Sequence, residues 1–267
     1  MKLNISIEYR TSWGEELVLC LEGKRYPLEY VADGLWKGEF DRLTLSKGAE
    51  YHYEVVREGK TVRKEWGSHV LPEKLTAKLL TVNDRWLDRP EDAPFYSSAF
   101  TKGIFGRSAA AASGAGQGVC IQGYAPVVRQ NEVLAIAGSG KFLGDWNRVV
   151  PFDDASFPVW NVSLETDEPF MYKILIADKE TLAPLAWEDG GNRIMGVVPQ
   201  KGECYLEAAL RPHFSGRQWR GAGTAIPVFS LRSEDDFGVG EFLDLKKMVD
   251  WAAETGQSVL QLLPIND

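Results

Sequence analysis

The sequence predicts a mostly β protein, in which two tandem antiparallel β-sandwiches are followed by a short, incomplete β/α segment. Short runs of alternating apolar residues, separated by turn residues, favour the sandwiches. The same pattern appears twice along the chain, and its period changes from strand-like to helical near the end. With 267 residues, of which 44% are hydrophobic, the chain can bury more than one core.

The charge balance narrows the class of partner. There are 30 Lys and Arg residues against 38 Asp and Glu residues, a net charge of -8. This acidic balance disfavours binding to nucleic acid or to an anionic membrane and suits a neutral ligand. No run approaches the roughly 20 apolar residues of a membrane span, and the first residues alternate like a strand. We therefore expect a cytoplasmic protein, and its oligomeric state is left open.

Cysteine and histidine usage gives no sign of a metal site or a disulfide framework. The three cysteines are widely spaced and odd in number: Cys20, Cys120 and Cys204. This spacing is typical of reduced thiols within strands. The histidines show no metal-ligand spacing either: His52, His69 and His213. We expect no metal ion and no cofactor.

The first predicted module covers residues 1–94. Short alternating runs punctuated by glycine are expected to form its strands: residues 3–9, 16–22, 36–43, 50–57, 61–66 and 75–82. Residues 95–117 then change in composition and end in the small-residue run SAAAASGAGQG. We interpret residues 95–117 as a linker, although a short helix through the alanines is the alternative.

The second predicted module covers residues 118–214 and repeats the first. Its strand-like runs are VCIQG, EVLAIAG, PVWNVSL, PFMYKILIA, LAWE and YLEAAL. Superposing the copies gives three aromatic pairs: Trp36 with Trp160, Tyr53 with Tyr172, and Trp66 with Trp187. Trp36 and Trp160 lie within apolar alternation, so we expect both in the cores.

A possible sugar-binding surface lies between residues 138 and 193. Trp146 and Trp187 sit beside turn-forming residues rather than within apolar alternation, in the company of Lys173, Glu188 and Asn192. A glucose ring has C–H groups on its faces and hydroxyls at its edge, so its site needs flat aromatic side chains and a few fixed polar groups. Alternatively, both tryptophans are core residues and the charges form a solvated rim.

The first module lacks most of these groups. Where the second module has Lys173, Glu188 and Asn192, the first has Glu54 and Gly67 and no clear asparagine, and it has no counterpart of the FLGDWN loop. We expect this module to bind glucan weakly through Trp66 or to act as a structural spacer.

The third predicted region covers residues 215–267. A strand-like run at 224–231 and a polar loop precede helical spacing over 241–255, which Gly256 ends as a C-cap; a second apolar strand follows from Ser258. Strand, helix and strand indicate a βαβ unit of a parallel sheet. About fifty residues cannot close a (β/α)8 barrel, so we expect the front part of a longer protein.

These residues carry a family resemblance. GSGKFLGDWN, the YK pair and WEDGGNR make residues 132–193 similar to a starch-binding module of carbohydrate-binding module family 20, an immunoglobulin-like sandwich. The tail from Trp219 resembles the opening of the TIM barrel of glycoside hydrolase family 77, the 4-α-glucanotransferases. Two tandem starch-binding modules before such a barrel resemble the plant cytosolic disproportionating enzymes and their bacterial relatives.

The resemblance implies a function and a set of binding residues. The family roles match Trp146, Lys173, Trp187, Glu188 and Asn192 as the α-glucan site, with Glu188 accepting from a sugar hydroxyl or holding Lys173. The parent protein would transfer glucosyl or maltooligosyl units between α-1,4-glucans by a retaining mechanism. A non-catalytic glucan-binding or regulatory protein is the alternative.

The resemblance places no catalytic carboxylate within these residues. The acidic run from Glu234 to Asp236 is expected to shape a loop or cap a helix, and Asn266 and Asp267 could border a substrate cleft. By itself, the chain is therefore expected to be inactive.

Overall fold

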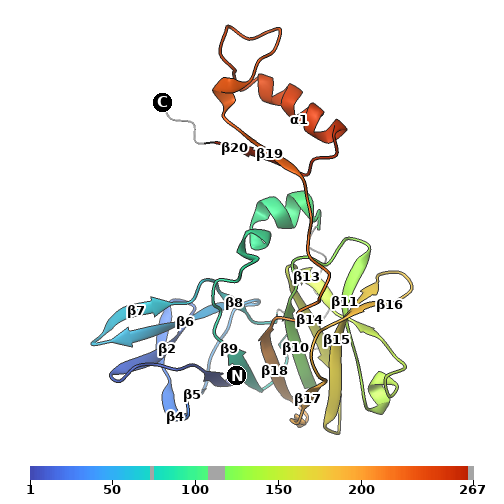
Figure 1. Cartoon of the computed structure of the whole chain (residues 1–267). Coiled ribbons are helices and arrows are strands. Elements are labelled where there is room, and N and C mark those ends of the chain that lie inside the picture. The colour runs from blue at the N-terminus through green and yellow to red at the C-terminus, as the bar shows by residue number, and fades with distance from the viewer. Residues whose placement is uncertain (73–74, 108–117, 264–267) are drawn as a thin grey trace. The chain divides into compact units, whose positions relative to one another are not determined.

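The computed structural model describes residues 1–72, 75–107 and 118–263 (Figure 1). They form two compact units, Met1–Gly216 and Arg217–Asp267. The predicted alanine-rich part of the linker, residues 108–117, lies outside the described residues, as do Asn266 and Asp267.

The first unit confirms the prediction of a β protein. The first module contributes nine strands: β1 (Lys2–Glu8), β2 (Glu15–Leu21), β3 (Lys24–Pro27), β4 (Glu29–Ala32), β5 (Leu35–Phe40), β6 (Glu50–Arg57), β7 (Lys60–Lys64), β8 (His69–Val70) and β9 (Leu79–Arg85). The second module contributes nine more: β10 (Gly118–Tyr124), β11 (Glu132–Gly138), β12 (Val150–Pro151), β13 (Asp153–Ser156), β14 (Val159–Leu164), β15 (Phe170–Asp178), β16 (Pro184–Trp187), β17 (Arg193–Met195) and β18 (Glu203–Leu210).

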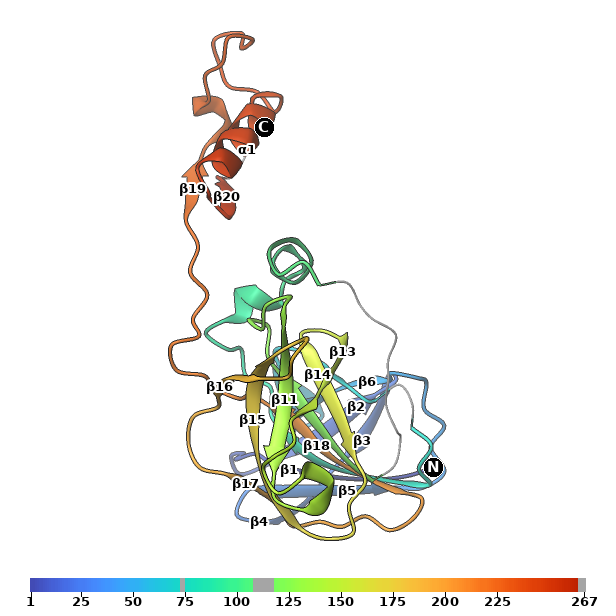
Figure 2. The same cartoon turned by 90° about the vertical axis from the view of Figure 1, so that its right-hand side faces the viewer.

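One eight-stranded sheet runs through both modules, in the order β13-β14-β10-β18-β9-β1-β5-β4. A second sheet covers it in each module: β2, β3, β6, β7 and β8 in the first, and β11, β12, β15, β16 and β17 in the second. Figure 2 shows β11 and β15 as a layer in front of β14 and β18. This arrangement is the sandwich that the alternating pattern predicted.

The modules join through backbone pairing that the sequence did not predict. Strands β9 and β18 are parallel neighbours, with Leu79 opposite Glu203 (Figure 1). Asn83 Nδ2 donates to Glu207 Oε2 at 3.0 Å, and Arg85 Nη1 donates to the Ala208 carbonyl at 2.8 Å. The modules are thus halves of a continuous sheet.

The two cores confirm the internal repeat. Trp36 on β5 and Trp160 on β14 are both buried, as expected. Each indole N–H donates to a carbonyl just beyond the neighbouring strand, to Tyr9 at 3.0 Å and to Ala125 at 2.9 Å. A buried indole needs such an acceptor, and both modules supply it at the same place.

Strand pairing corrects part of the repeat alignment. Tyr51 on β6 lies opposite His69 on β8, and Tyr172 on β15 lies opposite Arg193 on β17. Tyr172 therefore corresponds to Tyr51, and the predicted pairing with Tyr53 is wrong by two residues.

The same two-residue shift means that Trp66 and Trp187 are not at equivalent positions in the two modules. Glu65 accepts the backbone N–H of Tyr53 at 2.7 Å, and Glu188 accepts that of Ile174 at 2.8 Å. Because these glutamates are equivalent, Trp187 corresponds to the residue before Glu65, which is Lys64. The predicted pairing of Trp187 with Trp66 is therefore wrong, because the buried glutamate rather than the tryptophan is the common anchor.

The described half of the predicted linker is folded. Residues Ala93–Tyr96 form a 3-10 turn, η1, and Ala99–Ile104 form a π-helical turn, η2. Beyond them, Arg107 Nη1 donates to Asp154 Oδ2 at 2.6 Å, and Arg107 Nη2 donates to the Glu132 carbonyl at 2.6 Å. This guanidinium ties the segment to the second module.

The second unit confirms the βαβ prediction. Strand β19 (Gly223–Ile226), helix α1 (Asp244–Glu254) and strand β20 (Val259–Leu262) follow in order, and β19 pairs with β20 in parallel. The first strand is shorter than predicted because Pro227 begins the 3-10 turn η4 (Val228–Ser230). Gly256, at φ +71°, stands just past the helix, as its C-cap role requires.

None of the helices in the described ranges is long and apolar enough to cross a membrane.

Candidate functional site

Strand β15 supports the predicted sugar-binding residues of the second module. Its even-numbered residues, from Phe170 to Ile176, face the core, whereas Lys173 lies on the opposite, outward face. Trp187 on β16 is the cross-strand partner of Leu175, and directly paired residues share a face. Trp187 and Lys173 are therefore on the same outward face of the sheet.

A tight loop holds Trp146 next to this strand. The Trp146 N–H donates to the Gly138 carbonyl at 2.7 Å, and Gly138 pairs with Tyr172 of β15. Trp146 has φ +72°, a left-handed conformation that is rare for a bulky side chain. Asp145 before it is also left-handed, and its Oδ1 accepts the Gly140 N–H at 2.9 Å. The loop therefore maintains a strained conformation that presents Trp146.

Both tryptophans are open to solvent. Trp146 is 37% exposed and Trp187 is 43% exposed. The positions on β15 nearest to them are Tyr172, which pairs with the Gly138 that holds Trp146, and Leu175, which pairs with Trp187. These positions are three residues apart, or about 10 Å along a strand. The predicted alternative in which both are core residues is therefore wrong, because neither ring is buried.

Glu188 is buried and pairs with Arg193 rather than with Lys173. It is 3% exposed and binds the Arg193 guanidinium, with Nη2 to Oε2 at 2.8 Å and Nε to Oε1 at 3.0 Å. Its Oε1 also accepts the Ile174 N–H. Glu188 does not hold Lys173: the Lys173 ammonium instead donates to the Gly190 carbonyl at 2.7 Å.

These contacts fix the turn between β16 and β17. Burial lowers the pKa of Arg193, but the contact with Glu188 outweighs it and raises that pKa overall. Asp189 accepts the Ser215 hydroxyl at 2.8 Å and contacts His213 Nδ1 at 2.5 Å, which together lower the Asp189 pKa. Asn192, in the same turn, is exposed. The turn that carries Asn192 is thus bonded to β15 through Lys173 and Glu188, and to Ser215 through Asp189.

Two further apolar side chains border this surface, and the sequence analysis missed them. Met171 on β15 and Ile194 on β17 are cross-strand partners, and both are exposed. Met171 lies two residues before Lys173, so it shares the outward face. The signal available in the sequence was the alternation of β15, continued from Lys173 back to Met171.

Trp66, the candidate of the first module, is also exposed. Its backbone N–H donates to the Leu87 carbonyl at 3.1 Å, and its ring meets Tyr96 edge-on at 5.5 Å. It lies outside the strand positions that carry Lys173 and Trp187 in the second module.

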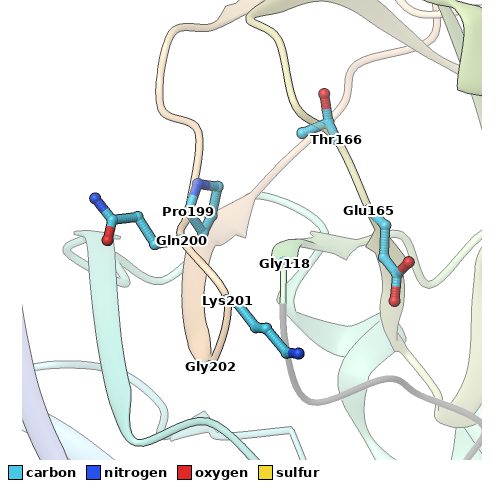
Figure 3. A pocket seen from close by; sticks show the side chains of 7 residues that line it. All are labelled: Gly118, Glu165, Thr166, Pro199, Gln200, Lys201 and Gly202. Atoms are coloured by element: carbon cyan, nitrogen blue, oxygen red, sulfur yellow. The ribbon is translucent and has the colours of Figure 1, made fainter.

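A cavity of about 200 Å3 lies elsewhere in the second module, at the turns that follow β14 and precede β18 (Figure 3). None of its lining residues is aromatic: Gly118, Glu165, Thr166, Pro199, Gln200, Lys201 and Gly202. It therefore offers no stacking surface for a sugar.

Two protein families match parts of the chain. Residues 119–205 match the family described as starch binding domain, and residues 226–267 match the family described as 4-alpha-glucanotransferase. The first range contains Trp146, Lys173, Trp187, Glu188 and Asn192.

Two similar proteins are named 4-alpha-glucanotransferases. The chain is 31% identical over 306 residues to 4-alpha-glucanotransferase DPE2 of Oryza sativa subsp. japonica, covering 99% of this chain and 31% of the rice protein. It is 51% identical over 45 residues to the 4-alpha-glucanotransferase of Chlamydia trachomatis serovar D, covering 17% of this chain and 8% of the bacterial protein. The chain therefore spans less than a third of the length of either relative.

A solved structure, the family 20 module of the maltotetraose-forming amylase from Pseudomonas saccharophila STB07, matches 34% of this chain and 99% of its own, at 20% identity and a TM-score of 0.29. The two family matches confirm the resemblance on sequence. The chain is therefore similar to a starch-binding domain over residues 119–205 and to part of the 4-alpha-glucanotransferase family over residues 226–267.

Proposed function

We propose that the second module binds α-1,4-glucan chains through the surface around Lys173. The observation that carries this proposal is the placement of two exposed tryptophans, Trp146 and Trp187, along the same strand β15. The starch-binding match over residues 119–205 supports it.

Each residue has a distinct role in the proposed site. Trp146 and Trp187 stack on neighbouring glucose units, and Lys173 and Asn192 donate hydrogen bonds to sugar hydroxyls. Glu188 is a positioning residue, because its buried carboxylate reaches Arg193 and the β15 backbone rather than solvent. By analogy with aromatic pairs, each stacked ring contributes about 1 kcal/mol. Because the costs of association offset much of the contact energy, we expect a dissociation constant in the micromolar to millimolar range.

We further propose that the whole protein is a cytoplasmic 4-α-glucanotransferase and that this surface binds the enzyme to its glucan substrate. The family match over residues 226–267 supports this assignment over a non-catalytic glucan-binding protein. In a retaining transfer, one carboxylate attacks the anomeric carbon while another protonates the leaving oxygen, and a second sugar replaces water as acceptor. The acidic balance of the chain suits a neutral polysaccharide better than an anionic membrane or nucleic acid.

Calorimetric titration with maltoheptaose tests the binding site. We expect saturable binding by the unmodified chain and its loss in both Trp146→Ala and Trp187→Ala, with unchanged thermal unfolding. Trp13→Ala is the matched control, because Trp13 is 100% exposed on the β1–β2 turn of the first module. Binding that survives both substitutions would exclude this surface and direct attention to Trp66.

A further inference from the structure

The first module carries three metal-ligating side chains on the outward face of its covering sheet. Cys20 on β2 lies directly opposite His52 on β6, and Glu54 follows two residues along the same strand. The alternate residues Tyr51, Tyr53 and Val55 are buried, so His52 and Glu54 share the other face. Cross-strand partners point to one side, which places the Cys20 thiol with them.

The donor atoms of these residues already converge. One ligand atom from each of Cys20, His52 and Glu54 lies within 4.8 Å of the other two. His52 Nε2 is 3.3 Å from Glu54 Oε1. All three residues are partly buried, so their side chains are restrained but remain open to an ion from solvent. A thiolate, an imidazole and a carboxylate are the ligand types that Zn²⁺ takes in proteins, commonly three from the protein and one water.

The remaining contacts orient the carboxylate for such an ion. Glu54 Oε2 accepts from Arg25 Nη2 at 2.8 Å and from the Thr61 hydroxyl at 2.8 Å. These donors occupy Oε2 and leave Oε1 on the side of His52. Hydrogen bonds that fix a ligating carboxylate from behind are a regular part of metal sites.

The location is informative because it matches the proposed glucan surface of the second module. Since Tyr51 corresponds to Tyr172, His52 stands at the position of Lys173, and Cys20 stands at that of Ala137. The first module therefore has side chains able to ligate a metal ion on the face where the second presents its lysine.

We propose that Cys20, His52 and Glu54 form a site for a divalent cation of the Zn²⁺ class, with water as the fourth ligand. On binding, the Cys20 thiol releases its proton to solvent and a sulfur–metal bond forms. The site is independent of glucan binding by the second module.

Cobalt(II) is the spectroscopic probe for this site in the full, reduced chain. We expect an intense thiolate-to-cobalt absorption band that saturates at equimolar Co²⁺ and disappears when Zn²⁺ is added. Cys20→Ser should abolish the band. His52→Gln removes a proposed ligand and should weaken cobalt binding by about tenfold or more, since loss of an outer-shell partner alone costs that much. Cys204→Ser should leave the band unchanged, because the buried thiols Cys120 and Cys204 contact each other away from the cluster.

Thermal unfolding separates a lost site from a lost fold. The metal-free Cys20→Ser variant should unfold at the temperature of the unmodified chain, whereas Zn²⁺ should raise the midpoint only in the unmodified chain. A cobalt band that persists in Cys20→Ser, or no band in the unmodified chain, would overturn the proposal.

Discussion

Glu65 and Glu188 occupy equivalent positions in the two modules, and each accepts a backbone N–H of the central strand of its covering sheet. The distances are 2.7 Å from Tyr53 and 2.8 Å from Ile174. Each glutamate also contacts a cationic partner from the short strand that follows, but the partners differ. Glu65 meets His69 at 3.0 Å, whereas Glu188 meets Arg193 at 2.8 Å. The buried anchor is therefore sensitive to pH in the first module but not through its partner in the second, because histidine titrates and arginine stays charged.

Replacing Glu188 with glutamine should destabilise the second module. The substitution leaves Arg193 without its carboxylate and weakens the bond to the Ile174 N–H. Because Arg193 is partly exposed, the expected cost is about 2 to 3 kcal/mol, below that of a fully buried ion pair. Urea unfolding monitored by tryptophan fluorescence measures it. A loss below about 0.5 kcal/mol would show that this ion pair does not anchor the turn.

The first module should lose stability at alkaline pH. His69 is fully buried, with Nε2 3.0 Å from Glu65 and Nδ1 3.2 Å from Asp84, the latter close enough for an ion pair but not aligned as a hydrogen bond. Burial lowers the His69 pKa, but the carboxylates of Asp84 and Glu65 outweigh it and raise the pKa from 6.5 to about 10. A raised histidine pKa stabilises the fold fully below pH 6.5, and this stabilisation is lost as the pH rises through 10.

Urea unfolding measured from pH 6.5 to 10 tests this dependence. We expect the free energy of unfolding to fall on the order of 3 kcal/mol across that window. The neighbouring tyrosines, Tyr51 and Tyr53, are buried beside Asp84, which raises their pKa well above the usual value, so they do not titrate in the same window. The His69→Gln variant should be less stable at neutral pH and have a flatter profile. An equally steep profile in His69→Gln would assign the effect to another group.

The sequence predicted the class of fold but not how the modules join. Alternation and turn residues indicated most long strands, and the tryptophans Trp36 and Trp160 marked both cores. The two- to four-residue strands, such as β8 and β17, are too short to show a period. The parallel pairing of β9 with β18 was also unpredictable, because it joins segments more than a hundred residues apart in the sequence.

The site was predicted in composition more than in geometry. Exposed Trp146 and Trp187 were recognised because they stand beside turns. Glu188 was expected to face sugar or Lys173, but a glutamate in a polar stretch looks the same in sequence whether it is buried or exposed. Its burial follows from Arg193 on β17, which only the three-dimensional pairing of β15 with β17 reveals.

Asp145 should control glucan affinity without touching the sugar. Its Oδ1 accepts the Gly140 N–H and so closes the loop that holds Trp146 in its left-handed conformation. Asp145→Ala removes this acceptor, and we expect maltoheptaose affinity to fall about threefold to tenfold, as for loss of one local hydrogen bond. Asp145→Asn keeps an oxygen in place and should retain most of the affinity. Equal losses in both variants would instead indicate that the negative charge matters.

Lys173 should contribute to glucan binding but little to stability. Its side chain is partly exposed, and its ammonium donates to the Gly190 carbonyl at 2.7 Å, leaving further N–H donors for a sugar hydroxyl. Lys173→Met keeps the aliphatic stem and removes all three donors. We expect maltoheptaose affinity to fall about fivefold to tenfold, with the unfolding free energy within about 0.5 kcal/mol of the unmodified chain.

Lys179→Met is the matched control, because Lys179 follows β15 at its far end and lies 3.5 Å from Asp154. Equal affinity losses in the two variants would point to a general charge effect, whereas a loss confined to Lys173→Met would place the sugar between the two tryptophans.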